Sequence, residues 1–261
     1  WNNIDIWVDV NEKYMIIIED KTFTNEHSNQ LNRYKDFASK WCHDNQRELI
    51  CIYLKTGNES KTSLGKIKDK GYSVFSRKDI IEILSRKKVE NDIYSDYLKR
   101  LISIDEKEEM YETSPIKNWS RLSWQGFYQF LDNQIEVRDW KYVNNPSSSF
   151  WGLWWHFYNW NGYLVYLQIE QGNLCFKIGE VYENRGSIRN AWHRKVIKTA
   201  GEENRLEIKK PKRFGSGTYM TVAVVERSAW LGDNDDIINK KRVVKKLKDY
   251  ETFLDRCLMN E

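Results

Sequence analysis

The stretch IDIWVDVNEKYMIIIEDK, residues 4–21, predicts a β-hairpin. Two runs rich in β-branched residues flank the polar triplet Asn-Glu-Lys, which has the length of a common hairpin loop. With a three-residue loop, Val10 pairs with Tyr14, and counting outward sets Asp5 directly opposite Glu19. The predicted hairpin therefore brings two carboxylates together.

The apolar pattern selects this register. Because side chains alternate across a strand, one face of the hairpin collects apolar side chains, and we expect this face to be the core. Its members are Ile4, Ile6, Val8, Val10, Ile16 and Ile18. The other face collects Asp5, Trp7, Glu19 and Lys21. A two-residue turn would set Asp5 opposite Ile18 and mix polar with apolar positions, so the three-residue loop is preferred.

Two facing carboxylates predict a cation between them. Their repulsion costs about 0.2–1 kcal/mol as a cross-strand pair, and a divalent cation reverses its sign. Mg²⁺ typically takes one or two protein carboxylates and keeps waters that can ionise and attack. Lys21, two residues after Glu19, is placed to stabilise a phosphorane-like transition state or to help deprotonate the attacking water. The alternative is a solvated strand face, on which Lys21 neutralises the two acids.

Helical spacing of apolar residues predicts a helix over residues 27–45. Gln30 and Tyr34 are one turn apart on this helix and share a face with Leu31. A glutamine on the buried side, just after the strand that carries Glu19 and Lys21, is placed to orient a water or a phosphate oxygen. Tyr34 would hold that glutamine in position.

The ordered set Asp5, Glu19-x-Lys21 and Gln30-x-x-x-Tyr34 resembles the PD-(D/E)XK nuclease superfamily. It is most similar to the stand-alone bacterial branch with an I-D-I strand, an I-I-E-x-K strand and a Q-L-x-x-Y helix. The segment KPKRFGSGTYM, residues 210–220, and the later Trp-Leu-Gly are similar to the C-terminal region of that branch. The resemblance thus covers nearly the whole chain.

This resemblance implies a restriction-endonuclease-like α/β core with a mixed sheet, which binds Mg²⁺ or Mn²⁺ and hydrolyses phosphodiester bonds. By position, Asp5 and Glu19 would be metal ligands, Lys21 the charge stabiliser and Gln30 an accessory catalytic group. It also implies a substrate that is DNA rather than RNA, and a role in bacterial defence against foreign DNA. The branch has a helix and a strand ahead of the Asp5 strand, so a further segment is expected before Trp1.

The order of predicted elements indicates α/β architecture in three parts. Residues 1–88 form the nuclease-like core, and residues 89–149 form a helical connector whose two helices are split near Ser114 and Pro115. Residues 150–261 form a β-rich mixed α/β domain. Within it, residues 163–170 and 174–179 flank a turn and predict a second hairpin.

Composition excludes several other classes of protein. The chain is 40% apolar and 31% charged, and no apolar run reaches the roughly 18 residues that a membrane helix needs. The four cysteines are too far apart for a zinc site or a disulfide framework, which favours a reducing, cytoplasmic setting. The four histidines share no metal-ligand spacing, and neither a phosphate-binding P-loop nor a G-x-S-x-G motif is present.

The net charge of +4 permits nucleic acid as a partner without requiring it. Lys210, Lys212 and Arg213 are candidate nucleic-acid contacts, together with Tyr34, although a basic run is more commonly a solvated face. One rival is a catalytically silent nuclease fold that senses or binds nucleic acid or a protein. Another is an enzyme for a different phosphate substrate, such as a nucleotide, in a closed pocket. A homo-oligomer or an activating protein partner is compatible with all three.

Overall fold

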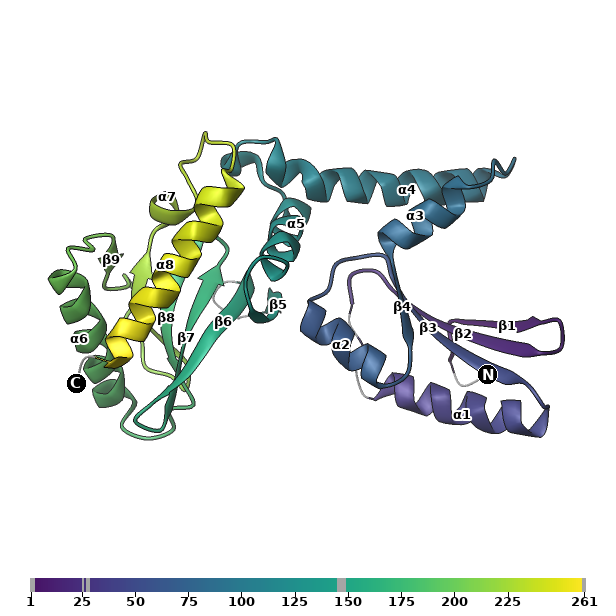
Figure 1. Ribbon diagram of the computed structural model, residues 1–261, viewed down its shortest axis with the longest axis horizontal. Coiled ribbons are helices and arrows are strands. Elements are labelled where there is room, and N and C mark those ends of the chain that lie inside the picture. The colour runs from purple at the N-terminus through teal and green to yellow at the C-terminus, as the bar shows by residue number, and fades with distance from the viewer. Residues whose placement is uncertain (1–2, 25, 27–28, 145–148, 260–261) are drawn as a thin grey trace. The chain divides into compact units, whose positions relative to one another are not determined.

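The computed structural model describes residues 3–24, 26, 29–144 and 149–259 (Figure 1). It divides the chain into a first unit that ends at Glu108 and a second unit that begins at Glu109. Each unit has its own sheet and its own hydrophobic core. This division differs from the three parts expected from the sequence, because the segment 89–149 is shared between the two units.

The first unit is a four-stranded sheet with helices on both sides (Figure 1). Its strands are β1 (Ile6–Val10), β2 (Tyr14–Lys21), β3 (Glu48–Lys55) and β4 (Ser73–Ser76), and its helices are α1 (Gln30–Asp44), α2 (Lys61–Asp69), α3 (Arg77–Ser85) and α4 (Asp92–Glu109). The strand order is β1-β2-β3-β4, with β1 antiparallel to β2 and the other neighbours parallel. The predicted mixed sheet of an α/β fold is confirmed.

The hairpin has the predicted register, because Val10 pairs with Tyr14 and the ladder runs outward to the pair Ile6 and Ile18. One further step along both strands leads to Asp5 and Glu19. The prediction of which face is buried was wrong. Ile6 is 42% exposed, whereas Glu19 is buried together with Met15 and Ile17 of β2.

Helix α1 explains this reversal. It packs on the odd-numbered face of β2, where Leu31 and Ala38 meet Ile17 in one cluster. The ring of Trp7 lies on the same face and contacts Trp41 edge-on, with the ring centroids 5.3 Å apart. The core of the first unit is therefore the face that carries Glu19, and the isoleucine-rich face is the more exposed one.

The helices of the first unit partly match the predictions. Helix α1 begins at Gln30, and residues 27 and 28 of the predicted helix lie outside the described residues. Helix α2 was not predicted; it is short, and only Ile67 among its residues is buried. Helix α3 begins after Ser76, whose side chain forms a reciprocal capping box with Asp79.

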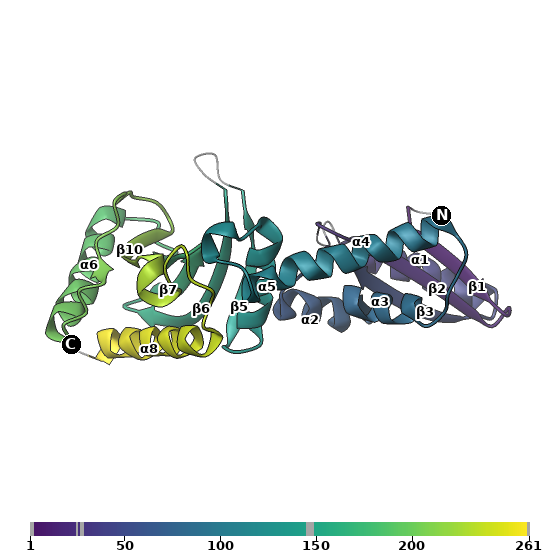
Figure 2. The same ribbon diagram turned by 90° about the horizontal axis from the view of Figure 1, so that it is seen from above.

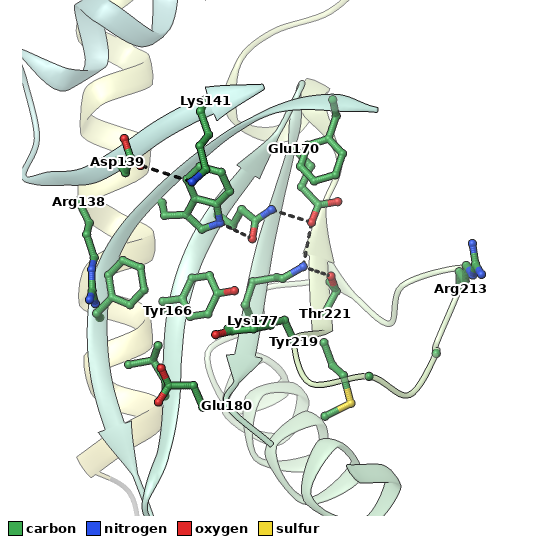
Figure 3. A pocket seen from close by; sticks show the side chains of 18 of the residues that line it. Arg138, Asp139, Lys141, Tyr166, Glu170, Lys177, Glu180, Arg213, Tyr219 and Thr221 are labelled. Carbon is green, nitrogen blue, oxygen red and sulfur yellow. Dashed lines mark hydrogen bonds and ion pairs between the residues drawn. The ribbon is translucent and has the colours of Figure 1, made fainter. Parts of the chain in front are cut away.

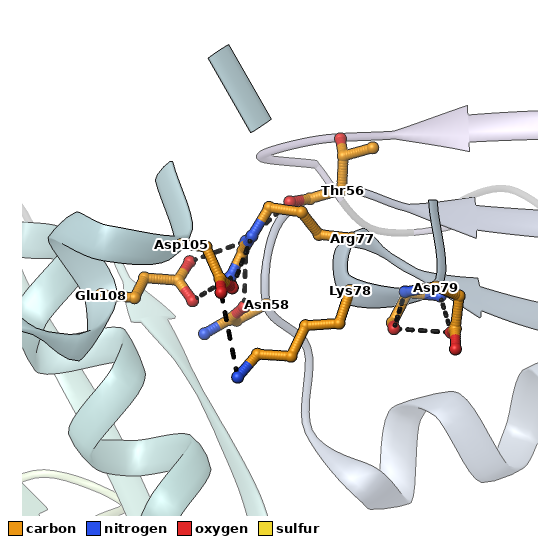
Figure 4. A network of polar contacts seen from close by, with 8 residues as sticks. Thr56, Asn58, Arg77, Lys78, Asp79, Asp105 and Glu108 are labelled. Carbon is orange, nitrogen blue, oxygen red and sulfur yellow. Dashed lines mark hydrogen bonds and ion pairs between the residues drawn. The ribbon is translucent and has the colours of Figure 1, made fainter. Parts of the chain in front are cut away.

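A buried ion network ties the end of α4 to the start of α3 (Figure 4). The guanidinium of Arg77 donates to the main-chain oxygen of Thr56 (2.8 Å), to Asp105 (2.9 Å) and to Glu108 (3.0 Å). Burial raises the pKa of Glu108, and the charge of Arg77 opposes this shift. The N–H groups of the guanidinium thus all have acceptors. Because two of these acceptors, Asp105 and Glu108, lie on α4, the network holds α4 to the first unit.

The second unit is a six-stranded antiparallel sheet of order β5-β6-β7-β8-β10-β9. Its strands are β5 (Val137–Val143), β6 (Phe150–Trp160), β7 (Tyr163–Glu170), β8 (Asn173–Gly179), β9 (Ile208–Lys209) and β10 (Met220–Val225), and its α-helices are α5 (Arg121–Asp132), α6 (Arg185–Glu202), α7 (Arg227–Trp230) and α8 (Lys240–Met259). The predicted second hairpin is confirmed as β7 and β8. Residues 137–142 had been predicted as helical and are instead strand β5.

The core of the second unit lies between the sheet and its helices. Helix α8 runs along one face of the sheet (Figure 2), where Tyr250 and Phe253 pack edge-on against Phe176 of β8. Trp151 and Trp155 are buried in this core, as expected for an apolar strand. Among the described residues, no helix is long and apolar enough to cross a membrane.

Candidate active site

The end of strand β2 holds the predicted acidic site. Glu19 is 1% exposed, and its Oε1 forms an ion pair with the ammonium of Lys21, two residues along the same strand face. Asp5 precedes β1, and its Oδ2 accepts the main-chain N–H of Asp20 at 2.9 Å. This hydrogen bond fixes the Asp5 carboxylate at the end of β2, next to Glu19.

The two carboxylates influence each other electrostatically. Burial raises the pKa of Glu19; the hydrogen bond from Lys21 lowers it, and the negative charge of Asp5 raises it further. The net shift is upward, so the surroundings of Glu19 supply less positive charge than its ionised carboxylate needs. A cation at this position would remove the deficit.

Lys21 is held in its charged form. Burial by itself would lower the pKa of Lys21, but the hydrogen bond and the negative charge of Glu19, together with the charge of Asp5, outweigh this effect and raise it. An ammonium with a raised pKa is protonated at neutral pH. Of the two roles predicted for Lys21, this favours stabilisation of negative charge over removal of a proton from water.

Gln30 and Tyr34 form a hydrogen-bonded pair in the first turns of α1. The Tyr34 hydroxyl donates to the main-chain oxygen of Asn3 at 2.7 Å, and it accepts from Gln30 Nε2 at 2.7 Å. Since the hydroxyl proton is committed to Asn3, the Gln30 amide must turn its nitrogen toward Tyr34. Gln30 Oε1 is then buried without a hydrogen-bond partner. Tyr34 also lies close enough to Lys21 to affect its pKa.

The oxygen atoms at this site fit a hard divalent cation. Glu19 Oε2 and Gln30 Oε1 are buried acceptors without a hydrogen-bond partner, and such atoms are costly unless a ligand satisfies them. Within the described residues, no group of three or more His, Cys, Asp or Glu side chains is placed to hold a metal ion. Two carboxylates are nevertheless the usual protein contribution to a Mg²⁺ site.

A second buried lysine was missed from the sequence. Lys55 pairs with Lys21 across β2 and β3, is 3% exposed, and donates to the main-chain oxygen of Thr24 at 2.6 Å. It also forms an ion pair with the buried Glu59 at 3.2 Å, while burial lowers its pKa. A lysine that ends an otherwise apolar, buried strand was the available signal.

The predicted nucleic-acid contacts belong to different units. Tyr34 is buried in the first unit, and its hydroxyl is already used twice, which suits a positioning role toward Gln30. Lys210, Lys212 and Arg213 lie in the second unit on the loop after β9, where they line a cavity of about 1060 Å³.

Comparison with known proteins supports the sequence motif. No curated protein and no solved structure matches this chain. The sequence model of the PD-(D/E)XK nuclease superfamily matches residues 1–138, which is more than half of the 261 residues and includes the whole Asp5, Glu19 and Lys21 site. The chain therefore belongs to the PD-(D/E)XK nuclease superfamily, a group of enzymes that hydrolyse phosphodiester bonds.

Proposed function

We propose that this protein is a metal-dependent deoxyribonuclease whose active site is the end of β2. The observation that carries the proposal is the buried Glu19 carboxylate, which faces Asp5 and whose Oε2 has no hydrogen-bond partner. A purely structural acid at 1% exposure would be fully paired. An acid that awaits a cation has a reason to keep this open oxygen.

Asp5 and Glu19 would hold Mg²⁺ or Mn²⁺, and the unpartnered amide oxygen of Gln30 would orient a water or a substrate group. When bound, the ion would supply Lewis acidity and an ionisable water. Lys21 would stabilise charge on the phosphate in the transition state, because its ammonium is held protonated beside Glu19. Tyr34 would orient Gln30 through the hydrogen bond between them.

The finer description rests on the resemblance of the motif to the stand-alone bacterial branch of the superfamily. DNA as substrate, a role in defence against foreign DNA and a cytoplasmic location are parts of this proposal. The unreacted thiols of Cys42, Cys51, Cys175 and Cys257 are buried, which is compatible with a reducing compartment. A homo-oligomer or an activating protein partner would control the nuclease activity.

One observation favours the alternative, a catalytically silent binding or sensor module. The described residues contain no set of three metal-ligating side chains, so the site offers two carboxylates and no third acidic ligand. A sensor could use Asp5 and Glu19 to hold a structural cation without cleaving the strand. The two functions differ in whether a folded, metal-bound protein turns over substrate.

The test is cleavage of circular and linear DNA, single- and double-stranded, with RNA in parallel and with Mg²⁺, Mn²⁺ or EDTA. Wild type is compared with Glu19→Gln, Lys21→Met and the control Glu12→Gln, which removes a carboxylate from the exposed hairpin loop. We expect metal-dependent cleavage by wild type and the control, and a loss of about 10³-fold or more in the two site variants. No cleavage of any substrate by a folded, metal-bound wild type would favour the silent module.

A further inference from the structure

The second unit has a pocket on the face of its sheet that α8 does not cover (Figure 3). The cavity is about 850 Å³, within the usual range for small-molecule sites. Alternate residues of β7 and β8 create it: Phe176 and its neighbours on one face enter the core, whereas Tyr166, Gln168 and Lys177 face the cavity. The family match ends at residue 138, before most of this pocket.

The floor of the pocket is a buried polar network. Gln168 is 3% exposed and Lys177 is 9% exposed, and both donate to Glu170 Oε1, at 3.0 and 2.9 Å. Lys177 Nζ also donates to the hydroxyl of Thr221 at 3.0 Å. Gln168 Oε1 accepts the indole N–H of Trp154 at 2.9 Å, which fixes that ring in the wall of the pocket.

This network keeps hydrogen-bonding capacity for a ligand. An ammonium has three donors, and Glu170 and Thr221 accept two of those of Lys177. The Gln168 amide has a second N–H, and Glu170 has a second carboxylate oxygen. Donors and an acceptor therefore stand side by side on the pocket floor. The edges of nucleobases present the complementary combination of donors and acceptors.

Aromatic side chains form the walls. The rings of Phe157 and Tyr166 are stacked, with centroids 4.7 Å apart and planes 13° apart. Tyr219 lies directly on the backbone of Gly179, where an added Cβ would come within 2.6 Å of its ring. The absence of a side chain at Gly179 thus brings Tyr219 beside Tyr166. The Arg138 guanidinium lies 4.6 Å from the centroid of the Phe157 ring, whose other face Tyr166 covers, so Tyr166 and Tyr219 form the wall against which a planar aromatic ligand would stack.

Both sides of the pocket rim are charged. On the β5 side, Lys141 forms an ion pair with Asp139 at 3.9 Å and Arg138 lies over the Phe157 ring, so both of these cations are already engaged. Glu180 follows β8, and Arg213 lies on the loop at the opposite side (Figure 3). Arg213 is shared with the neighbouring cavity of the second unit, which Lys210 and Lys212 also line. An anionic group attached to a planar ring would lie toward this basic loop.

We propose that this pocket binds a nucleotide, with the base against Tyr166 and Tyr219 above Gln168, Glu170 and Lys177 and the phosphate toward Arg213. The nucleotide is one unit of a single-stranded nucleic acid whose backbone follows the basic loop, or it is a free nucleotide; the recognition chemistry is the same. The site is separate from the carboxylates of the first unit, so binding does not depend on hydrolysis there.

The test is equilibrium binding in EDTA, which prevents cleavage. The full chain is titrated by calorimetry with each of the four ribonucleoside monophosphates, and by fluorescence anisotropy with a labelled single-stranded DNA 10-mer. Both probes are repeated with Glu12→Gln, which changes only the exposed hairpin loop of the first unit and should bind as wild type does. Binding of both probes indicates a free-nucleotide pocket that also accepts a strand, and binding of the 10-mer alone indicates a strand site.

Tyr219→Ala is the decisive variant, because this side chain is 56% exposed and its removal leaves the core intact. We expect at least a fivefold loss of affinity, in line with the contribution of one stacked base. Tyr182→Ala is the matched control, since Tyr182 is 69% exposed and does not line the pocket. Arg213→Ala should weaken binding and reduce its salt dependence, whereas Arg242→Ala on α8 should do neither. No binding of either probe, or equal losses in the two tyrosine variants, would overturn the proposal.

Discussion

Each unit has a partly buried glutamate–lysine ion pair on its sheet, but the two pairs are satisfied differently. In the second unit, Glu170 Oε1 accepts from both Gln168 and Lys177, and Lys177 also reaches Thr221. In the first unit, Glu19 contacts Lys21, but its other oxygen has no hydrogen-bond partner and a second acid lies beside it.

The contrast separates two kinds of function. The paired network around Glu170 is stable without a ligand and offers only its spare donors and acceptor, which suits recognition of a neutral polar edge. The Glu19 site carries excess negative charge and open oxygens, which suits a cation. The degree to which a buried charge is already paired thus indicates what its site is built to accept.

Arg77→Ala tests a buried charge whose hydrogen-bonding groups are all paired. Arg77 is fully paired with Asp105, Glu108 and a main-chain oxygen, and removing the cation leaves Glu108 buried and uncompensated. We expect a loss of about 3 kcal/mol in the stability of the first unit. Hydrogen–deuterium exchange, read peptide by peptide, measures this loss of stability separately in the first unit. Arg86→Ala, which removes an exposed i,i+4 pair with Glu82, should cost less than about 0.5 kcal/mol. Equal effects would mean that the network contributes nothing.

The sequence was sufficient for the register of the hairpin but not for its buried face. Apolar residues occupy both faces of β2, where Met15 and Ile17 alternate with Ile16 and Ile18. Local alternation cannot decide between two apolar faces. The choice is made by α1, which covers the face of Glu19, and that packing is a non-local property.

One further prediction failed and one helix was missed, both for local reasons. Strand β5 resembled a helix because its buried residues, Val137 and Trp140, are three positions apart, and a bulge after Val137 produces this spacing. Helix α2 buries too little for a periodic signal. The proposed nucleotide pocket could not be predicted from the sequence. Its residues are spread over several strands that are far apart in the chain, and each strand contributes only a few: β5, β6, β7, β8 and β10.

Addition of metal should stabilise the first unit through the unsatisfied site. At a free Mg²⁺ concentration of 100 times Kd, binding adds about 2.7 kcal/mol to the stability of the folded state. Exchange protection of β2 should therefore rise with Mg²⁺ and fall on addition of EDTA. Glu19→Gln should abolish this response, and Glu12→Gln should preserve it. A response that survives in Glu19→Gln would place the cation elsewhere.

Neutralising each glutamate in metal-free protein compares the two pairs directly. Glu170→Gln leaves the Lys177 ammonium without its carboxylate, and we expect a cost of about 1–2 kcal/mol to the second unit. Glu19→Gln removes a buried charge that Asp5 repels, so it should leave the first unit no less stable in EDTA. Urea titrations in which hydrogen–deuterium exchange monitors the unfolding of each unit measure both changes. A comparable loss in Glu19→Gln would show that the first pair is also structural.

The smallest effect is the pH dependence that Glu19 gives the metal-free protein. Folding raises the pKa of this carboxyl above its usual 4.5, chiefly through burial, so the folded state holds the proton more tightly than the unfolded state. The resulting penalty is absent below pH 4.5, grows as the pH rises through the folded pKa, and is constant above it.

Subtracting the Glu19→Gln profile isolates this contribution, because Glu108 also has a raised pKa and is common to both proteins. In EDTA, the stability of wild type relative to Glu19→Gln should therefore fall as the pH rises from 4.5 through the folded pKa. Mg²⁺ should flatten or reverse that slope, since the cation competes with the proton for the same carboxylate. A difference profile that rises with pH in EDTA would mean that Lys21 fully compensates Glu19, and that the site has no electrostatic need for a metal.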